Sequence, residues 1–167
     1  MGTIRAKNMA INAKRFSLSL PLPALLANGT RNFSIFAVPE HPARVAATRY
    51  VLKKIYIHTP TVYASVAGTV LMNVIKRRGA STDTNLVTSF DLEVGAALAY
   101  TEVTLLGSLV LGDRTLLGGD RVRGTIVSNN ADATGPVAAE AVLVVELEPV
   151  SVSGEQAFDA DGNVENV

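Results

Sequence analysis

The chain has 167 residues, with no cysteine, no tryptophan, 48% apolar residues and 18% charged residues. This length suits one domain with a single buried core, and the lack of cysteine excludes a disulfide framework and any thiolate metal site. Every uninterrupted apolar run falls short of the roughly 18 residues of a membrane span, and the chain does not start with the continuous apolar block of a signal peptide. We therefore expect a soluble globular protein made inside the cell, with no membrane partner.

Fifteen basic and fifteen acidic residues cancel in sum, but they are unevenly distributed along the chain. Residues 1–78 contain 12 Lys or Arg and one acid, whereas residues 79–167 contain 3 Arg and 14 acids. We expect this asymmetry to become two faces or two ends of opposite charge, which would favour packing of copies against one another or docking on a charged surface. The basic residues are too dispersed to predict a nucleic-acid partner.

Residues 1–32 are predicted to form an extended arm. Apolar residues alternate in it with serine and proline, which is the period of a strand: Phe16, Leu18, Leu20 and Leu22. Because Pro21 and Pro23 cannot donate hydrogen bonds to a neighbouring strand, this segment can only be an edge strand or an added strand. We expect its four apolar side chains, together with Arg15, to bind a neighbouring molecule by adding a strand to that molecule's sheet.

Valine and threonine are abundant in the rest of the chain, and glycine and proline interrupt it at short intervals, as is typical of β-proteins. Further strands are predicted over residues 32–38, 49–58, 62–76, 86–92, 101–111, 121–128 and 137–148. Gly68 is expected to mark a bulge or bend in the long strand over 62–76. Two stretches, 40–48 and 93–99, could each hold a short helix.

Seven or eight strands without long helices between them predict an all-β fold. The long connections favour a jelly-roll-like antiparallel β-sandwich. We place this sandwich over residues 33–149, after the extended N-terminal arm (1–32). An acidic C-terminal tail (150–167) is predicted to follow it, with four acids beyond residue 150.

Groups that could support catalysis are sparse. The chain has two histidines, His41 and His58, which lie on different predicted elements with no partner at metal-ligand spacing. No nucleophile elbow, phosphate-binding loop or zinc-protease motif occurs. The stretch 159–165 is similar to the first half of a calcium loop but lacks the glutamate at the twelfth position, so an acidic tail is the better interpretation. We therefore predict no enzyme, and no catalytic, cofactor-binding or metal-binding residues.

Three stretches together resemble small β-rich proteins of tailed bacteriophage particles: residues 64–70 (ASVAGTV), 118–122 (GGDRV) and 125–132 (TIVSNNAD) before the Val-rich closing strand. The resemblance is to head decoration, or cement, proteins, and it covers roughly residues 33–149. It implies a homodimer or homotrimer on the capsid exterior, bound to the lattice of the major capsid protein and reinforcing the shell. It implies no role for individual residues.

Two other functions stay open. One is another structural phage component, such as a head-fibre base, a neck protein or a tail protein. The other is a carbohydrate-binding or hydrolytic β-sandwich, which a cleft with Asp113 and Asp120 brought together would favour. The four tyrosines are scattered along the sequence and tryptophan is absent, so the aromatic platforms that bind sugars are weakly represented.

Overall fold

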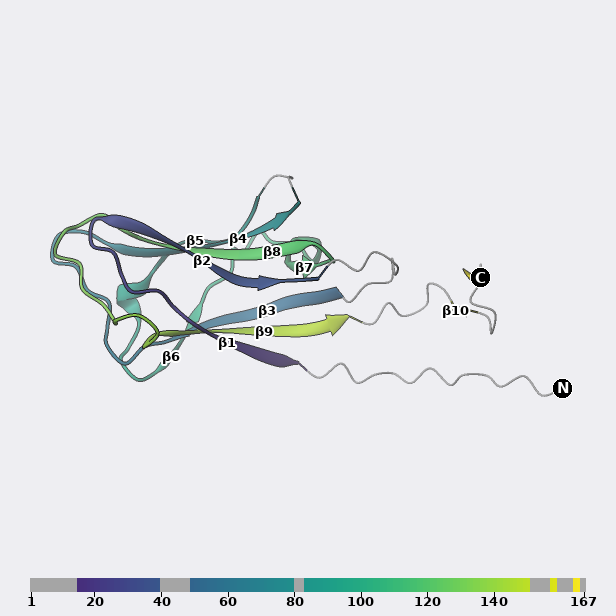
Figure 1. Cartoon of the computed structure of the whole chain (residues 1–167), viewed down its shortest axis with the longest axis horizontal. Coiled ribbons are helices and arrows are strands. Elements are labelled where there is room, and N and C mark those ends of the chain that lie inside the picture. Colours follow the sequence, from purple (N-terminus) through teal and green to yellow (C-terminus); the bar gives the residue numbers. More distant parts are fainter. Residues whose placement is uncertain (1–14, 40–48, 80–82, 151–156, 159–163, 166–167) are drawn as a thin grey trace.

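The computed structural model describes residues 15–39, 49–79, 83–150, 157–158 and 164–165. Two antiparallel sheets in this part of the chain pack face to face (Figure 1). The first sheet has the strand order β1-β9-β3-β6, with β7 appended to β3, and the second has the order β2-β8-β4-β5. Their bounds are β1 (Phe16–Pro21), β2 (Gly29–Ala37), β3 (Arg49–His58), β4 (Val70–Arg78), β5 (Thr84–Asp91), β6 (Tyr100–Val103), β7 (Thr115–Leu116), β8 (Asp120–Ser128) and β9 (Val142–Val150).

The strand pairing is that of one long antiparallel ribbon folded over on itself. β1 pairs with β9, β2 with β8, β3 with β6 and β4 with β5, so early strands meet late ones in nested order. The folded ribbon closes into two sheets because β3 also pairs with β9 and β4 with β8. Eight strands in this order form a jelly roll. The predicted all-β sandwich is confirmed.

The core lies between the two sheets and follows the strand period. In β9, Leu143, Val145 and Leu147 are buried, while the residues between them face outward, because successive side chains of a strand point to opposite faces. On the second sheet, the Phe33 ring lies over Gly124, its partner across the β2–β8 pair. The glycine provides the space that this ring occupies.

The structure corrects the extent of the N-terminal arm. Phe16–Pro21 pairs with Leu147–Val142 of β9 in the same chain, and Leu22 is only 2% exposed. The sandwich therefore begins with β1, not at residue 33, because the apolar face of this strand is covered by the chain's own core. The edge position expected from the prolines is observed. Residues 1–14 of the predicted arm lie outside the described residues.

Other predicted boundaries also change. The strand at 49–58 matches β3, but the long strand over 62–76 is divided: residues 62–69 form a connection and β4 starts at Val70. Gly68 lies in that connection. The strand over 101–111 ends at Val103 as β6, and a short helix, α1 (Leu111–Arg114), follows it. Of the possible helices, 93–99 contains only the end of a 3₁₀ turn, η1 (Leu92–Val94), and 40–48 lies outside the described residues.

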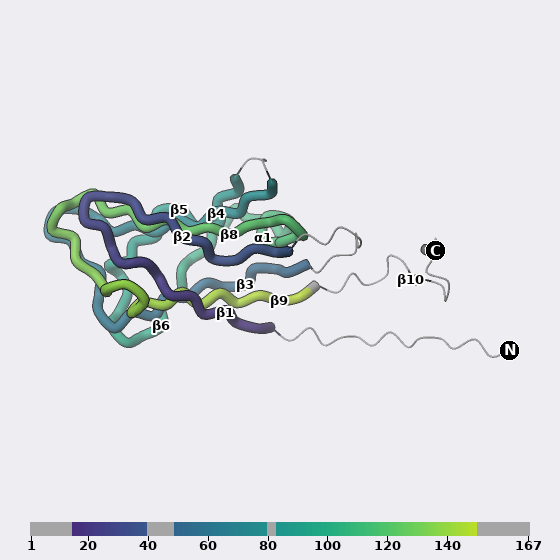
Figure 2. The backbone as a smooth tube through the Cα atoms, viewed as in Figure 1, coloured from purple at the N-terminus to yellow at the C-terminus, as the bar shows by residue number. Residues whose placement is uncertain are grey.

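The sandwich has two different ends. The connections 22–28, 59–69, 92–99 and 129–141 gather at one end, which we call the loop end (Figure 2). The opposite end is where β1 and β8 begin and β4 and β9 finish, and we call it the basic end. Beyond it, β10 (Ala157–Phe158) and β11 (Val164–Glu165) form a separate two-stranded antiparallel sheet.

The two charge halves of the sequence are interleaved rather than separated. Five ion pairs among the described residues each join a cation from residues 1–78 to an acid from residues 79–167: Arg15–Glu148, Lys53–Glu148, Lys54–Glu102, Arg77–Asp83 and Arg78–Asp120. The nested strand pairing causes this, because it sets early strands beside late ones. A difference between the ends remains, since the loop end contains Glu93, Asp132 and Glu140 but no Lys or Arg.

Candidate interaction surfaces

The residues predicted to bind a partner through the arm belong to the sandwich itself. Leu22 is buried, and the other three apolar side chains, Phe16, Leu18 and Leu20, pack against the core. Arg15 lies 3.3 Å from a carboxylate oxygen of Glu148 on the adjacent strand. These side chains therefore stabilise the chain's own first sheet and are not available to fill pockets on a neighbour.

Backbone pairing braces the loop end. Ala64 and Thr134 form an isolated antiparallel bridge in which each amide donates to the other's carbonyl, at 3.0 and 2.8 Å. The amide of Asn28 donates to the carbonyl of Asn130, and the amide of Leu98 donates to the carbonyl of Thr59, at 2.9 and 2.8 Å. Connections between different strand pairs are thereby fastened to one another, which makes the loop end a rigid surface.

That rigid surface exposes large apolar side chains. Val66 is 89% exposed and Val137 is 61% exposed, and they belong to the two connections that the Ala64–Thr134 bridge joins. Other exposed apolar residues of the same end are Leu26, Val62, Val94 and Leu98. An exposed apolar surface with few charges is typical of a site that contacts another protein.

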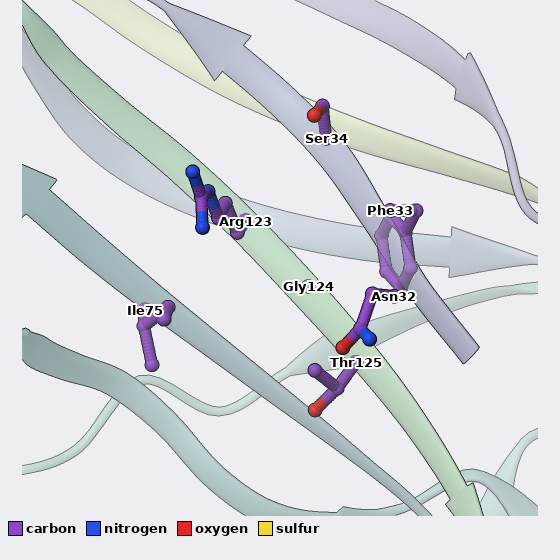
Figure 3. Close-up of a pocket in the computed structure, with 7 residues that line it drawn as sticks. All are labelled: Asn32, Phe33, Ser34, Ile75, Arg123, Gly124 and Thr125. Carbon is purple, nitrogen blue, oxygen red and sulfur yellow. The ribbon is translucent and has the colours of Figure 1, made fainter. Parts of the chain in front are cut away.

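A shallow furrow follows the outer face of the second sheet along the seam between β2 and β8. Its lining includes Asn32, Ser34, Ile75, Arg121, Arg123 and Thr125, and we call it the arginine furrow. Figure 3 draws the part of it around Arg123. Toward the basic end it continues past Arg121 to Gly118 and Gly119. Figure 3 shows Asn32 of β2 beside Thr125 of β8, with Arg123 two residues away on the same strand.

The arginine furrow carries positive charge that the described residues leave largely uncompensated. Arg77 lies directly opposite Arg121 on the neighbouring strand, an arrangement of like charges that destabilises a sheet. Asp83 compensates one of the two, since it accepts two hydrogen bonds from Arg77, at 2.5 and 2.8 Å, which lower the pKa of its carboxyl. Within the described ranges, Arg121 and Arg123 form no ion pair.

The outer face of the first sheet gathers aromatic residues that are distant in sequence. The rings of His58 and Tyr100, on β3 and β6, lie 4.8 Å apart, and Tyr100 is 68% exposed. Lys54 lies over the ring of Tyr56 on the same face. Although the tyrosines are scattered along the sequence, the fold brings Tyr56 and Tyr100 to the same face of the first sheet. Of the other two tyrosines, Tyr50 packs against the core and Tyr63 is buried in it.

The two carboxylates named for a hydrolytic cleft have structural partners. Asp120 is buried and accepts hydrogen bonds from Arg78 and from the amide of Leu117. Burial would raise the pKa of Asp120, but these hydrogen bonds and the nearby Lys76 charge hold it below its usual range. Asp113 accepts a hydrogen bond from the amide of Val110 at the start of α1. The hydrogen bonds of Asp113 and Asp120 therefore stabilise the connection between β6 and β8.

Lys76 supports the same connection from within. Its ammonium group is buried and donates to the carbonyl oxygens of Gly112 and Thr115, at 3.1 and 3.3 Å. Burial lowers the pKa of Lys76, although the charges of Asp120 and Asp113 act in the opposite direction. The cluster fastens the second sheet to α1.

Among the described residues, no three His, Asp or Glu side chains lie close enough to hold a metal ion. The calcium-loop-like stretch falls mostly outside them. The part of the chain that the structure describes also has no helix long and apolar enough to cross a bilayer.

Comparison with known proteins finds no matching family model and no curated protein of significant similarity.

Sequence reasoning missed the apolar surface of the loop end and the arginine furrow. The valines of the loop end occur in stretches that resemble strands, so their exposure has no signal in the residue pattern. The arginines of the furrow did have a signal in the sequence. The alternation Arg121-Val122-Arg123 places two cations on the same face of one strand. Only the strand register brings Arg77 beside them.

Proposed function

We propose that this chain is a structural virion protein, a decoration subunit that binds the assembled head of a tailed bacteriophage and stabilises it. One observation carries the proposal: a rigid, cross-braced loop end exposes Val66 and Val137 and contains no basic residue. A rigid apolar surface loses little conformational entropy on binding, so most of its burial contributes to affinity. The jelly-roll core, a fold that recurs in viral shells, supports the same assignment.

The stabilisation follows from mass action. A subunit that binds only the assembled lattice adds its binding free energy to the stability of that lattice. The loop end would supply the contact, and the sandwich would act as a rigid body that bridges neighbouring capsid subunits. No chemical step is needed for this role.

The test compares two exposed-valine variants in the full-length protein. Val66→Asp with Val137→Asp places two charges on the loop end, while Val110→Asp is a control at a valine that is 65% exposed at the basic end. The probe is the expanded, undecorated head of the phage that encodes the chain. We expect the loop-end variant to lose at least about tenfold in co-sedimentation with heads and to give no thermal protection, while the control binds normally. Equal binding by both variants would overturn the proposal.

A particle reconstruction separates decoration from the other structural roles. Density on the outer surface of the head supports a decoration protein, whereas density at the neck, in the tail or at the base of a head fibre assigns the chain to that component instead.

The aromatic face of the first sheet favours one second candidate, carbohydrate binding. The adjacent rings of His58 and Tyr100, with Tyr56 on the same face, form the kind of surface on which sugar rings stack. A glycan array with the wild type and with Tyr100→Ala tests it. Binding that the substitution abolishes would support this function, and an array without binding would contradict it.

A further inference from the structure

We propose that the arginine furrow binds the acidic C-terminal segment, residues 151–167, of a second copy of this chain. This inference does not depend on the decoration role. It starts from the cost of the furrow itself: Arg77 and Arg121 lie directly opposite each other, and a like-charge cross-strand pair is destabilising. Asp83 pairs with Arg77, and among the described residues Arg121 and Arg123 form no ion pair, so the furrow can take an anionic partner.

The spacing of the arginines selects an extended or turning acidic peptide. Arg121 and Arg123 are two residues apart on one strand, so their Cα atoms are about 6.6 Å apart on the same face. Ser34 and Asn32 of β2 and Thr125 of β8 line the furrow with hydrogen-bonding groups. Such a surface fits carboxylates spaced along a peptide backbone, with Arg supplying paired donors for each of them.

The C-terminal segment has matching chemistry. It contains four acids, Glu155, Asp159, Asp161 and Glu165, and no Lys or Arg. Asp159 and Asp161 repeat the two-residue spacing of the furrow arginines. Charge and spacing are therefore complementary.

The pairing of β10 with β11 indicates that the segment needs a surface to dock on. These strands have two residues each and form a sheet separate from the sandwich, and an isolated two-stranded hairpin is at best marginally stable in water. β9 ends at Val150 on the same end of the sandwich at which Arg121 lies. From Val150, the ten residues to Ala160 can extend about 33 Å. Because β10 and β11 form a sheet apart from their own sandwich, a segment of this length can extend toward a second copy.

The absence of cysteine from the chain allows a clean test by disulfide trapping in the full-length protein. Ser34→Cys places a thiol in the furrow of one copy, and Ala160→Cys places one between the two aspartates of another. The two single variants are distinguished by a size tag and mixed under mild oxidation. Ser19→Cys is the matched control, because Ser19 is also an exposed serine on an outer sheet face, but on β1 of the first sheet.

We expect a heterodimer between the Ser34→Cys and Ala160→Cys proteins, at about five times the yield obtained with Ser19→Cys. The excess should disappear in about 1 M salt, where the Debye length is about 3 Å. It should also disappear when Arg121→Gln and Arg123→Gln are added to the Ser34→Cys protein. Arg31→Gln with Arg49→Gln removes the same amount of charge outside the furrow and should leave the yield unchanged.

Three results would overturn the proposal. One is equal trapping by Ser34→Cys and Ser19→Cys. A second is a product that forms only within one chain when a single copy carries both Ser34→Cys and Ala160→Cys. The third is absence of trapping together with tight binding of a single-stranded oligonucleotide that Arg121→Gln and Arg123→Gln abolish, which would make nucleic acid the occupant.

Discussion

Arg78, the last residue of β4, donates two hydrogen bonds to the buried carboxylate of Asp120, the first residue of β8, at 2.7 and 2.9 Å. The same carboxylate accepts the amide of Leu117 at 2.9 Å, so it fixes both the start of β8 and the turn that precedes it. The side chain of Asp120 is 0% exposed, so water screens this ion pair less than it screens a pair between two exposed side chains.

We expect Asp120→Asn to lower the free energy of unfolding by about 2 kcal/mol, because it leaves a buried site with poorly matched donors. Asp83→Asn is the matched control. Asp83 accepts two hydrogen bonds from Arg77 in a similar way, but both side chains of that pair are partly open to solvent, so its loss should cost clearly less than the loss at Asp120. Urea denaturation of both variants measures the difference. Similar losses in the two would contradict a special role for Asp120.

Stability should fall as the medium becomes acidic. Hydrogen bonds from Arg77 to Asp83 and from Lys53 to Glu148 lower the pKa of each carboxyl, and the pKa of Asp120 is lowered as well. Because the unfolded chain, with carboxyl pKa values of about 4, binds protons first, the contribution of these groups is complete above about pH 5 and is lost as the pH falls through the lower folded values. Melting temperatures between pH 7 and pH 2 test this. A flat profile below pH 5 would refute it.

Gly124→Ala should destabilise the second sheet. A Cβ atom at this position would lie 2.1 Å from Cζ of the Phe33 ring, so the ring must move out of its place over the sheet. Such overpacking costs about 1–3 kcal/mol. A double-mutant cycle with Phe33→Leu isolates the contact: if the smaller side chain does not reduce the cost of Gly124→Ala, the clash is not its cause.

Tyr63→Phe should be neutral or stabilise the protein by up to about 1 kcal/mol. Burial raises the pKa of Tyr63 to about 12, and among the described residues its hydroxyl has no hydrogen-bond partner. Removing an unpartnered buried hydroxyl relieves a desolvation cost while the ring still packs beneath the loop end. Thermal unfolding measures the change, and a loss above about 1 kcal/mol would show that the hydroxyl is hydrogen-bonded.

Alternation of apolar residues predicted strands well where one face is buried by the chain itself. It located β3 at its observed bounds, and in β9 the alternation matches the buried side chains. The same signal failed over residues 62–69 and 104–111, where valine, leucine and threonine occur in connections. These connections are held by hydrogen bonds to other parts of the chain, such as Ala64 with Thr134 and Leu106 with Leu86, and no local pattern encodes such contacts.

The alternation in residues 16–22 shows how a correct local prediction led to a wrong placement. The period identified an edge strand, and the prolines excluded a central one. Neither states which sheet the strand joins, because alternation specifies the face of a strand and not its neighbour. The structure pairs it with β9 of the same chain.

Composition and period by themselves determined that this protein is an all-β sandwich without a disulfide framework, because strand-forming residues with a two-residue period can bury their apolar side only between sheets. The tertiary structure alone decided what the surface presents. Arg77 and Arg121 are 44 positions apart in the sequence, and Val66 and Val137 are 71 positions apart. Each pair shares a surface because the nested pairing of the jelly roll sets early strands and connections beside late ones, and that register depends on the whole core rather than on any local stretch.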